Sequence, residues 1–406
     1  MRTLILAAVA SLVLCAPAQA QRLAGVRPDV ASDEGGLWAV SDKTEGSARQ
    51  SAELDRDPAL NAYVRDVACK VARDHCADIR VYVMDRPFFN ATMAPNGYTE
   101  VWSGTLLRAA DEAQLAFVLG HEVSHFDRNH SLLSWRRKKS TSNAMMVLSA
   151  GVAVVGVAAA SSATTYDGAS SILDATRSLI DVVYLTGMAS LFAYGRENES
   201  EADRLGLDRA AHAGYAPSAG TELWRAQMGE TQASDFKRVR TSGTRTNIFA
   251  SHPLDAERIA ALQENLKSLP NTGETGRARH RAAIRPHLAT WLRDDLRRRD
   301  FGQTLHLIGR LAADGEDLGV LNFYRGEAHR QRRGEGDLTS ARDAYLAAAA
   351  YPDAPVAVWR ELGDLRRKAS DAAGAKAAYE TYLAKASTAE DAWIVQDSLN
   401  SLTSGK

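Results

Sequence analysis

Residues 115–125 read LAFVLGHEVSH, an apolar run that ends in a polar motif. Each residue of a helix turns by about 100°, so His121 and His125 lie on one face, one turn apart. Two imidazoles at that spacing can bind one Zn²⁺, and Glu122 then lies beside the metal, where it can take a proton from water. Burying such polar side chains is costly unless a metal or hydrogen bonds satisfy them. The stretch therefore predicts a buried zinc site with one ion per chain.

A zinc site of this kind needs a third protein ligand, and a later segment offers one. Residues 197–203 read ENESEAD and lead into an apolar pattern, so they predict the start of a second helix. Glu199 and Asp203 are four residues apart and share a face of that helix. One carboxylate can bind the metal while the other accepts the free N–H of a ligand histidine. The alternative is a solvated acidic helix start, which the helix dipole favours.

Together these motifs resemble a known family. The stretch HEVSH at 121–125, followed by Glu199-x-x-Ala202-Asp203, resembles the gluzincin peptidases related to the CaaX prenyl protease and HtpX. Three more segments resemble parts of that family: Asn90-Ala91 through Pro95-Asn96-Gly97-Tyr98, Arg128-Asn129-His130, and Ser251-His252-Pro253-Leu254 with Arg258-Ile259. The order of leader, peptidase and repeats is similar to the periplasmic beta-barrel assembly-enhancing proteases.

The resemblance implies a role for each residue of the site. His121, His125 and Glu199 would be the zinc ligands. Glu122 would be the general base of peptide hydrolysis, and Asp203 would orient a ligand histidine from outside the ligand set. We therefore expect a zinc metalloendopeptidase.

Two further histidines are interpreted less directly. The resemblance gives His252 a catalytic part, either as a fourth zinc ligand that holds the enzyme off or as a group that stabilises the oxyanion; the alternative is a histidine beside a turn-forming proline. His130 lies off the ligand face and is interpreted as structural. The Asn90-Ala91 strand would be an edge to which a substrate adds in extended form. Prenyl substrates are not implied, because the prenyl proteases span the membrane many times and this chain lacks clear spans.

Composition and the N-terminus narrow the location. The chain has 406 residues, with 49 basic against 50 acidic side chains, so nothing indicates nucleic acid as a partner. Residues 1–20 combine a positive start, an apolar stretch and the small-x-small site Ala18-Gln19-Ala20, which is typical of a cleavable signal peptide. We therefore expect a periplasmic protein. The mature chain would keep Cys69 and Cys76, either as a short disulfide or as two buried free thiols.

The pattern along the chain predicts a mostly α peptidase domain at 21–270 with a small sheet, that is, an α+β zincin-like domain. Residues 21–55 are polar and Gly-rich and are expected to wrap loosely. A helix is predicted from Pro58 to Arg73, a strand over 79–84, and two extended segments around Pro-Asn-Gly within 91–102. Asp111 and Gln114 form a capping box for the helix that carries the histidines.

Two uncharged or nearly uncharged stretches follow, at 144–163 and 179–194. The first is about long enough to span a bilayer. Alanine, glycine and serine dominate it, whereas membrane insertion rewards leucine, isoleucine and phenylalanine, so we favour a buried helical hairpin or a flap over the active site. Peripheral membrane contact through these two stretches stays open.

Residues 275–406 predict an all-α domain of tetratricopeptide-like helical repeats. Two segments are self-similar at a spacing near forty, and the second follows the Trp-x2-Leu-Gly pattern from Trp359, with Ala375 and Tyr379 after it. The alternative is a generic helical bundle. Such repeats present a concave surface for docking, so they could bind substrate or the outer-membrane assembly machinery.

The whole chain thus predicts a zinc endopeptidase of the bacterial cell envelope that removes misfolded or stalled envelope proteins. The competing interpretation is a chaperone or adaptor whose repeats bind envelope proteins with little proteolysis. A zinc hydrolase acting on small molecules is disfavoured, because nothing in the sequence suggests a small-molecule pocket.

Overall fold

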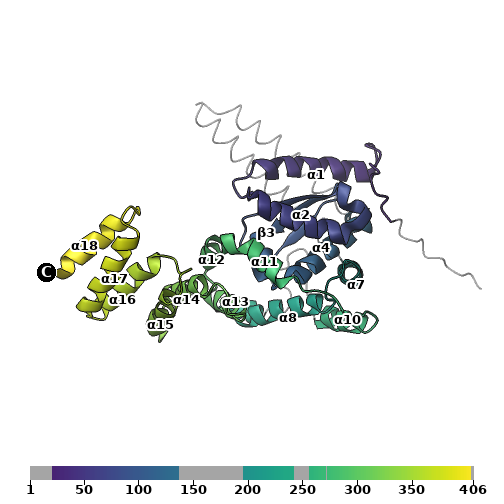
Figure 1. Cartoon of the computed structure of the whole chain (residues 1–406). Coiled ribbons are helices and arrows are strands. Elements are labelled where there is room, and N and C mark those ends of the chain that lie inside the picture. The colour runs from purple at the N-terminus through teal and green to yellow at the C-terminus, as the bar shows by residue number, and fades with distance from the viewer. Residues whose placement is uncertain (1–20, 137–194, 242–255, 271, 404–406) are drawn as a thin grey trace, which may run out of the picture.

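A computed structural model of the chain describes residues 21–136, 195–241, 256–270 and 272–403 (Figure 1). The expected signal peptide, the two apolar stretches at 144–163 and 179–194, and His252 lie outside these residues. Within the described part of the chain, no helix is long and apolar enough to cross a bilayer. The described residues are mostly α-helical and include one small sheet, which confirms the predicted fold class.

The described sheet has three strands in the order β1-β3-β2. β1 (Arg80–Met84) runs parallel to β3 (Tyr98–Trp102), and β2 (Ala91–Met93) runs antiparallel to β3 with Ala91 opposite Val101. These strands match the predicted alternation and the predicted Pro-Asn-Gly turn. β2 therefore lies at the edge of the sheet.

The central helix of the first part of the chain, the predicted peptidase domain at 21–270, is α4 (Glu112–Asp127). All residues of α4 are buried. It packs against α2 (Pro58–Ala72), α7 (Arg196–His212) and the edge strand β2. The predicted cap by Asp111 is confirmed, because its carboxylate accepts a hydrogen bond from the Gln114 backbone N–H at 2.9 Å, whereas the Gln114 side chain accepts from the Ala110 backbone N–H at 2.9 Å instead of from Asp111. The other described helices of this part are α1 (Asp33–Gln50), η1 (Arg73–Asp78), α3 (Ser103–Arg108), α8 (Ala219–Gln232), α9 (Lys237–Thr241) and α10 (Ala256–Leu266).

Helix α1 shows that the expectation of a loosely wrapped segment at 21–55 was wrong. The Ser32 hydroxyl caps its N-terminus by accepting the Gly35 backbone N–H at 3.0 Å. Leu37 is buried, and Glu45 pairs with Arg80 of β1 at 2.6 Å, so the helix is fixed to the sheet. Tertiary packing and a good cap outweigh the low helix propensity of the glycines in this segment.

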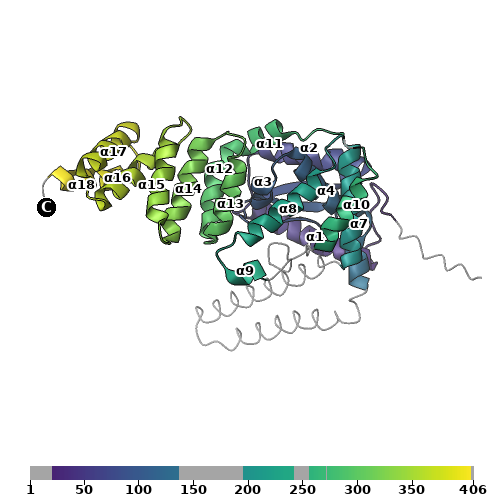
Figure 2. The same ribbon diagram turned by 90° about the horizontal axis from the view of Figure 1, so that it is seen from below.

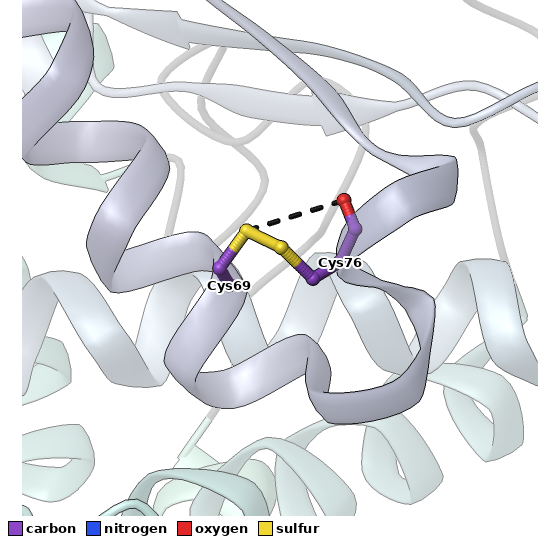
Figure 3. The surroundings of a disulfide bond; sticks show 2 residues. All are labelled: Cys69 and Cys76. Atoms are coloured by element: carbon purple, nitrogen blue, oxygen red, sulfur yellow. Dashed lines mark hydrogen bonds between the residues drawn. A yellow bond between two sulfur atoms is a disulfide. The ribbon is translucent and has the colours of Figure 1, made fainter.

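The alternatives for the two mature cysteines are resolved in favour of a disulfide. Cys69, near the end of α2, is bonded to Cys76 in η1 with their Cα atoms 4.6 Å apart (Figure 3). The bridge ties the end of α2 to the short 3₁₀ helix that leads into β1.

The C-terminal part is a succession of helices that lie side by side and lead away from the first part (Figure 2). Its elements are α11 (Arg277–Ile284), η3 (Arg285–His287), α12 (Leu288–Arg297), α13 (Phe301–Leu311), α14 (Leu318–Arg332), α15 (Asp337–Ala349), α16 (Ala357–Lys368), α17 (Ala372–Lys385) and α18 (Ala392–Thr403). The same contact recurs in two successive helix pairs. Gly326 of α14 packs on the ring of Tyr345 of α15, and Gly363 of α16 packs on the ring of Tyr379 of α17.

The two parts share a hydrophobic core that runs from α2 and α4 into α12, α13 and α14. A buried ion cluster reinforces the joint: Arg108 of α3 pairs with Glu230 of α8 at 2.7 Å and with Asp295 of α12 at 2.6 Å. The predicted domain boundary near 270–275 stays a prediction, because the core continues across it.

Candidate metal centre

Helix α4 places both imidazoles of the HEVSH stretch toward one point. The Nε2 atoms of His121 and His125 are 3.0 Å apart, and both side chains are buried. Two glycines, Gly120 of α4 and Gly206 of α7, let the neighbouring helix α7 come close to this point. A Cβ atom on Gly206 of α7 would lie 2.8 Å from the backbone nitrogen of His121, so only glycine permits this close approach.

Helix α7 supplies the carboxylate of Glu199 to the same point. Its Oε2 lies 3.6 Å from His121 Nε2, and its Oε1 lies 3.6 Å from His125 Nε2. Ligand atoms of these three residues all lie within 4.8 Å of one another, and all three residues are buried. A tetrahedral zinc ion with bonds of about 2.0–2.1 Å keeps its ligand atoms about 3.3 Å apart, so two imidazoles and a carboxylate in this arrangement fit Zn²⁺.

The other ring nitrogen of His121 contacts Asp203, one turn after Glu199 on α7. The distance from His121 Nδ1 to Asp203 Oδ1 is 3.0 Å. Burial would raise the pKa of Asp203, but Arg258 and His121 outweigh it and lower this pKa to about 2. The ionised carboxylate accepts the Nδ1–H, which leaves Nε2 of the neutral imidazole as a lone-pair donor for a metal.

The other ring nitrogen of His125 contacts His130. Their Nδ1 atoms are 2.8 Å apart, and His130 Nε2 lies 3.3 Å from Glu201 Oε2. A consistent proton arrangement has His125 Nδ1–H donating to His130 and His130 Nε2–H donating to Glu201, so that His125 Nε2 carries the lone pair. Burial lowers the pKa of His130, which favours its neutral form. His130 is thus off the ligand face, as interpreted, but it directly supports a ligand.

Arg258 of α10 is part of the centre, although the sequence alone gave it no role there. Its guanidinium donates to Asp203 at 2.7 and 2.8 Å and pairs with Glu199 Oε2 at 2.9 Å. The side chain is only 3% exposed. A charge-assisted fork of this kind fixes both carboxylates on α7. The sequence feature that could have indicated this role is the position of Arg258, six residues after His252 in the segment that resembles the family.

Glu122 lies beside a small cavity between α4 and the edge strand. The cavity has a volume of about 20 Å³, and His121, Ala91 of β2 and Glu122 border it. Its apolar wall is formed by Phe89, Val118 and Trp224. The edge strand, the proposed base and a small apolar recess thus lie together.

Comparisons with known proteins identify relatives of the chain. The model of Peptidase family M48 matches residues 54–266, more than half of the chain. Over 278 residues the chain is 25% identical to a relative from Vibrio cholerae, and this match covers 66% of the chain and 53% of the relative. It is 23% identical over 243 residues to the beta-barrel assembly-enhancing protease of Escherichia coli strain K12, which covers 57% of the chain and 45% of that protein.

A third relative comes from a eukaryote. The chain is 27% identical over 200 residues to the mitochondrial metalloendopeptidase OMA1 of Schizosaccharomyces pombe, which covers 49% of the chain and 50% of that protein. The chain spans about half the length of the relatives it matches.

Proposed function

Because the chain belongs to peptidase family M48, we propose that it is a zinc-dependent endopeptidase that hydrolyses peptide bonds of envelope proteins. The observation that carries the proposal is the convergence of His121 Nε2, His125 Nε2 and the Glu199 carboxylate on one buried point. A neutral, oriented imidazole pair with one anionic oxygen ligand is the donor set of many catalytic zinc sites.

In the proposed mechanism, His121, His125 and Glu199 would hold a zinc ion, which when bound would supply Lewis acidity for hydrolysis. The carboxylate of Glu122 would take a proton from the attacking water and later pass it to the leaving amine. Asp203 and His130 hold the protons of the two ligand imidazoles on Nδ1, so that both Nε2 atoms keep their lone pairs.

The substrate would bind in extended form along β2 (Ala91–Met93). This strand pairs with β3 on one side and borders the cavity beside Glu122. Adding a peptide strand to a sheet edge gives affinity through main-chain hydrogen bonds, while pockets for alternate side chains give specificity. His252 would complete the site in one of its two roles, as a fourth ligand at rest or as the group that stabilises the oxyanion.

We further propose a quality-control role in the periplasm, with the C-terminal helices acting as tetratricopeptide-like docking repeats. The recurrent glycine–tyrosine contact in successive helix pairs supports a repeat architecture. The same feature favours the second candidate, a chaperone or adaptor that binds envelope proteins and rarely cleaves them, because a docking surface needs no catalysis.

The experiment that tests the proposal compares the full-length protein with Glu122→Gln. We expect the parent protein to carry zinc and to cleave casein, and the variant to keep its zinc while losing about a hundredfold to ten-thousandfold in activity. Equal casein cleavage by both proteins would refute the assignment of Glu122. A Glu122→Gln protein that fully rescues a null strain would instead favour the chaperone. Full-length protein is needed, because deleting the residues after 275 would expose the shared core.

A further inference from the structure

The C-terminal end of α4, two residues beyond His125, is capped by the first described residues of the chain. The last carbonyl groups of a helix have no partner within the helix and must find one elsewhere. The Arg22 backbone N–H donates to the Asp127 carbonyl at 2.8 Å, and Arg22 Nε donates to the Phe126 carbonyl at 3.3 Å. Arg22 thus satisfies two of these carbonyls, and its positive charge is favourable at the negative end of the helix dipole.

The guanidinium of Arg22 contacts one acidic and two aromatic side chains. It pairs with Glu34 at 2.8 Å, and its Cζ atom lies 4.4 Å from the centre of the Phe126 ring and 5.6 Å from that of Trp38. Arg22 is 8% exposed, whereas the next residue, Leu23, is 70% exposed. The chain therefore buries this one side chain and leaves its neighbour in solvent, so the contact is specific to the arginine.

Arg22 also reaches the turn that carries His130. Its Nη2 donates to the Asn129 side-chain oxygen at 2.5 Å. Asn129 has φ of +52°, a left-handed conformation that asparagine tolerates better than most residues, and this turn directs His130 back toward α4. The next contact is the 2.8 Å pair of His130 Nδ1 and His125 Nδ1. A continuous set of contacts thus runs from Arg22 to a proposed zinc ligand.

We propose that Arg22 is a positioning residue of the metal centre: by capping α4 and fixing Asn129, it holds His130 against His125 and so raises the affinity for zinc. This inference rests on the proposed function, because it requires His125 to be a ligand. If the signal peptide is removed after Ala20, Arg22 is the second residue of the mature chain, so N-terminal trimming by two residues would weaken the centre.

A purely structural role for Arg22 makes a different prediction. The end of α4 has other anchors, because the Asp127 carboxylate also pairs with Arg209 at 2.7 Å and with His75 at 3.3 Å. Loss of the Arg22 side chain should therefore leave the protein folded. A simple anchor would lower the melting temperature and leave the zinc affinity of the folded protein unchanged, whereas a positioning residue changes that affinity.

The experiment measures zinc affinity of the full-length protein by competition with a chelator, together with the visible spectrum of the Co²⁺-substituted protein. Groups that orient a ligand histidine are typically worth tenfold to a hundredfold in metal affinity. We expect Arg22→Ala to bind zinc about tenfold more weakly and to alter the Co²⁺ spectrum. Arg22→Lys should recover part of the affinity, since lysine keeps the charge but lacks the fork. Leu23→Ala is the matched control and should behave like the parent.

A second variant covers the case in which Arg22→Ala does not fold. Asn129→Gly keeps a residue suited to positive φ but removes the oxygen that Arg22 binds, so it should also weaken zinc binding, by about threefold to tenfold. Parent-like zinc affinity in both variants, or in Asn129→Gly alone if Arg22→Ala is unfolded, would overturn the inference. A parent protein that binds no zinc would overturn the proposed function as well.

Discussion

At the scale of single residues, Glu199 brings the only negative charge to the proposed ligand set. We expect Glu199→Gln to be purified with less than about a tenth of the parent zinc content, because a neutral amide is a poor zinc ligand and the buried Arg258 loses one of its ionic partners. Glu197→Gln is the control, since Glu197 lies on the same helix but is exposed. Metal analysis by mass spectrometry decides: full zinc occupancy in Glu199→Gln would contradict the ligand assignment.

Another single residue, Val118, lines the recess beside Glu122. Val118→Ala should enlarge the recess and let the enzyme accept bulkier side chains next to the cleaved bond. Val123→Ala, on the same helix but in the main core, should lose a similar stability of about 2 kcal/mol without changing the preference. Mass spectrometry of a digested peptide mixture gives the cleavage sites. Identical preferences in the parent and Val118→Ala would show that the recess does not receive a substrate side chain.

The residues of the centre differ in how far the sequence could predict them. The spacing of His121 and His125 fixes their common face, and Glu199 and Asp203 share a face for the same reason. Arg258 could not be derived, because its role depends on how α10 crosses α7, which is a tertiary contact. The role of Gly206 was equally hidden, since a close helix approach leaves no periodic signal. The position of His252 stays a prediction.

At the scale of elements, periodic helices and strands were predicted from sequence, while α1 was not. The glycines at the start of α1 suggested a loop, yet the Ser32 cap and the packing of Leu37 stabilise a helix there. A pattern describes what a segment can form alone, whereas burial against β1 and β3 is decided by residues far along the chain.

The glycine–tyrosine contacts give a prediction for the C-terminal helix pairs. A Cβ atom on Gly363 would lie 2.3 Å from Tyr379 Cε1, so Gly363→Ala must displace the ring or separate α16 from α17. We expect a loss of about 1–3 kcal/mol in the free energy of unfolding. Gly309→Ala is the control, because nothing lies within 4 Å of its added Cβ in α13, and it should gain about 0.5–1 kcal/mol from helix propensity.

Urea unfolding followed by circular dichroism measures both changes. Gly363→Ala as stable as the parent would show that the two helices can separate at no cost, and the contact would then not specify the packing of this pair.

At the scale of the whole molecule, the two parts behave as one packed body at their joint. The shared core and the Arg108 cluster connect α3 and α8 to α12. Burial would lower the pKa of Arg108, but its two carboxylate partners raise it, so this guanidinium stays charged at all ordinary pH values. The change in amino-acid pattern predicted a domain boundary near residue 275. The sequence could not indicate that the hydrophobic core continues across this boundary, because the helix faces that meet there belong to helices far apart in sequence.

His280 of α11 makes this joint sensitive to acid. Its Nε2 donates to the Leu106 carbonyl at 2.9 Å, and its Nδ1 lies 3.0 Å from the Tyr63 hydroxyl, which can donate to the neutral ring. Burial lowers the pKa of His280 to about 4, against about 6.5 in an unfolded chain. Between these values the unfolded state binds a proton that the folded state does not, so stability falls as the pH decreases from about 7 to 4.

We expect this one group to remove about 3 kcal/mol of unfolding free energy over that range, and to contribute no pH dependence above about pH 7.5. Other groups titrate in the same range, so the measurement compares urea unfolding of the parent with that of His280→Gln at several pH values. Glutamine keeps a donor and an acceptor but does not titrate, and it leaves the remaining groups common to both proteins. The free energy of unfolding of the parent, relative to that of His280→Gln, should therefore fall steadily from pH 7 to pH 4. A difference that stays constant over this range would show that His280 has the same pKa in the folded and unfolded states, and would contradict the prediction.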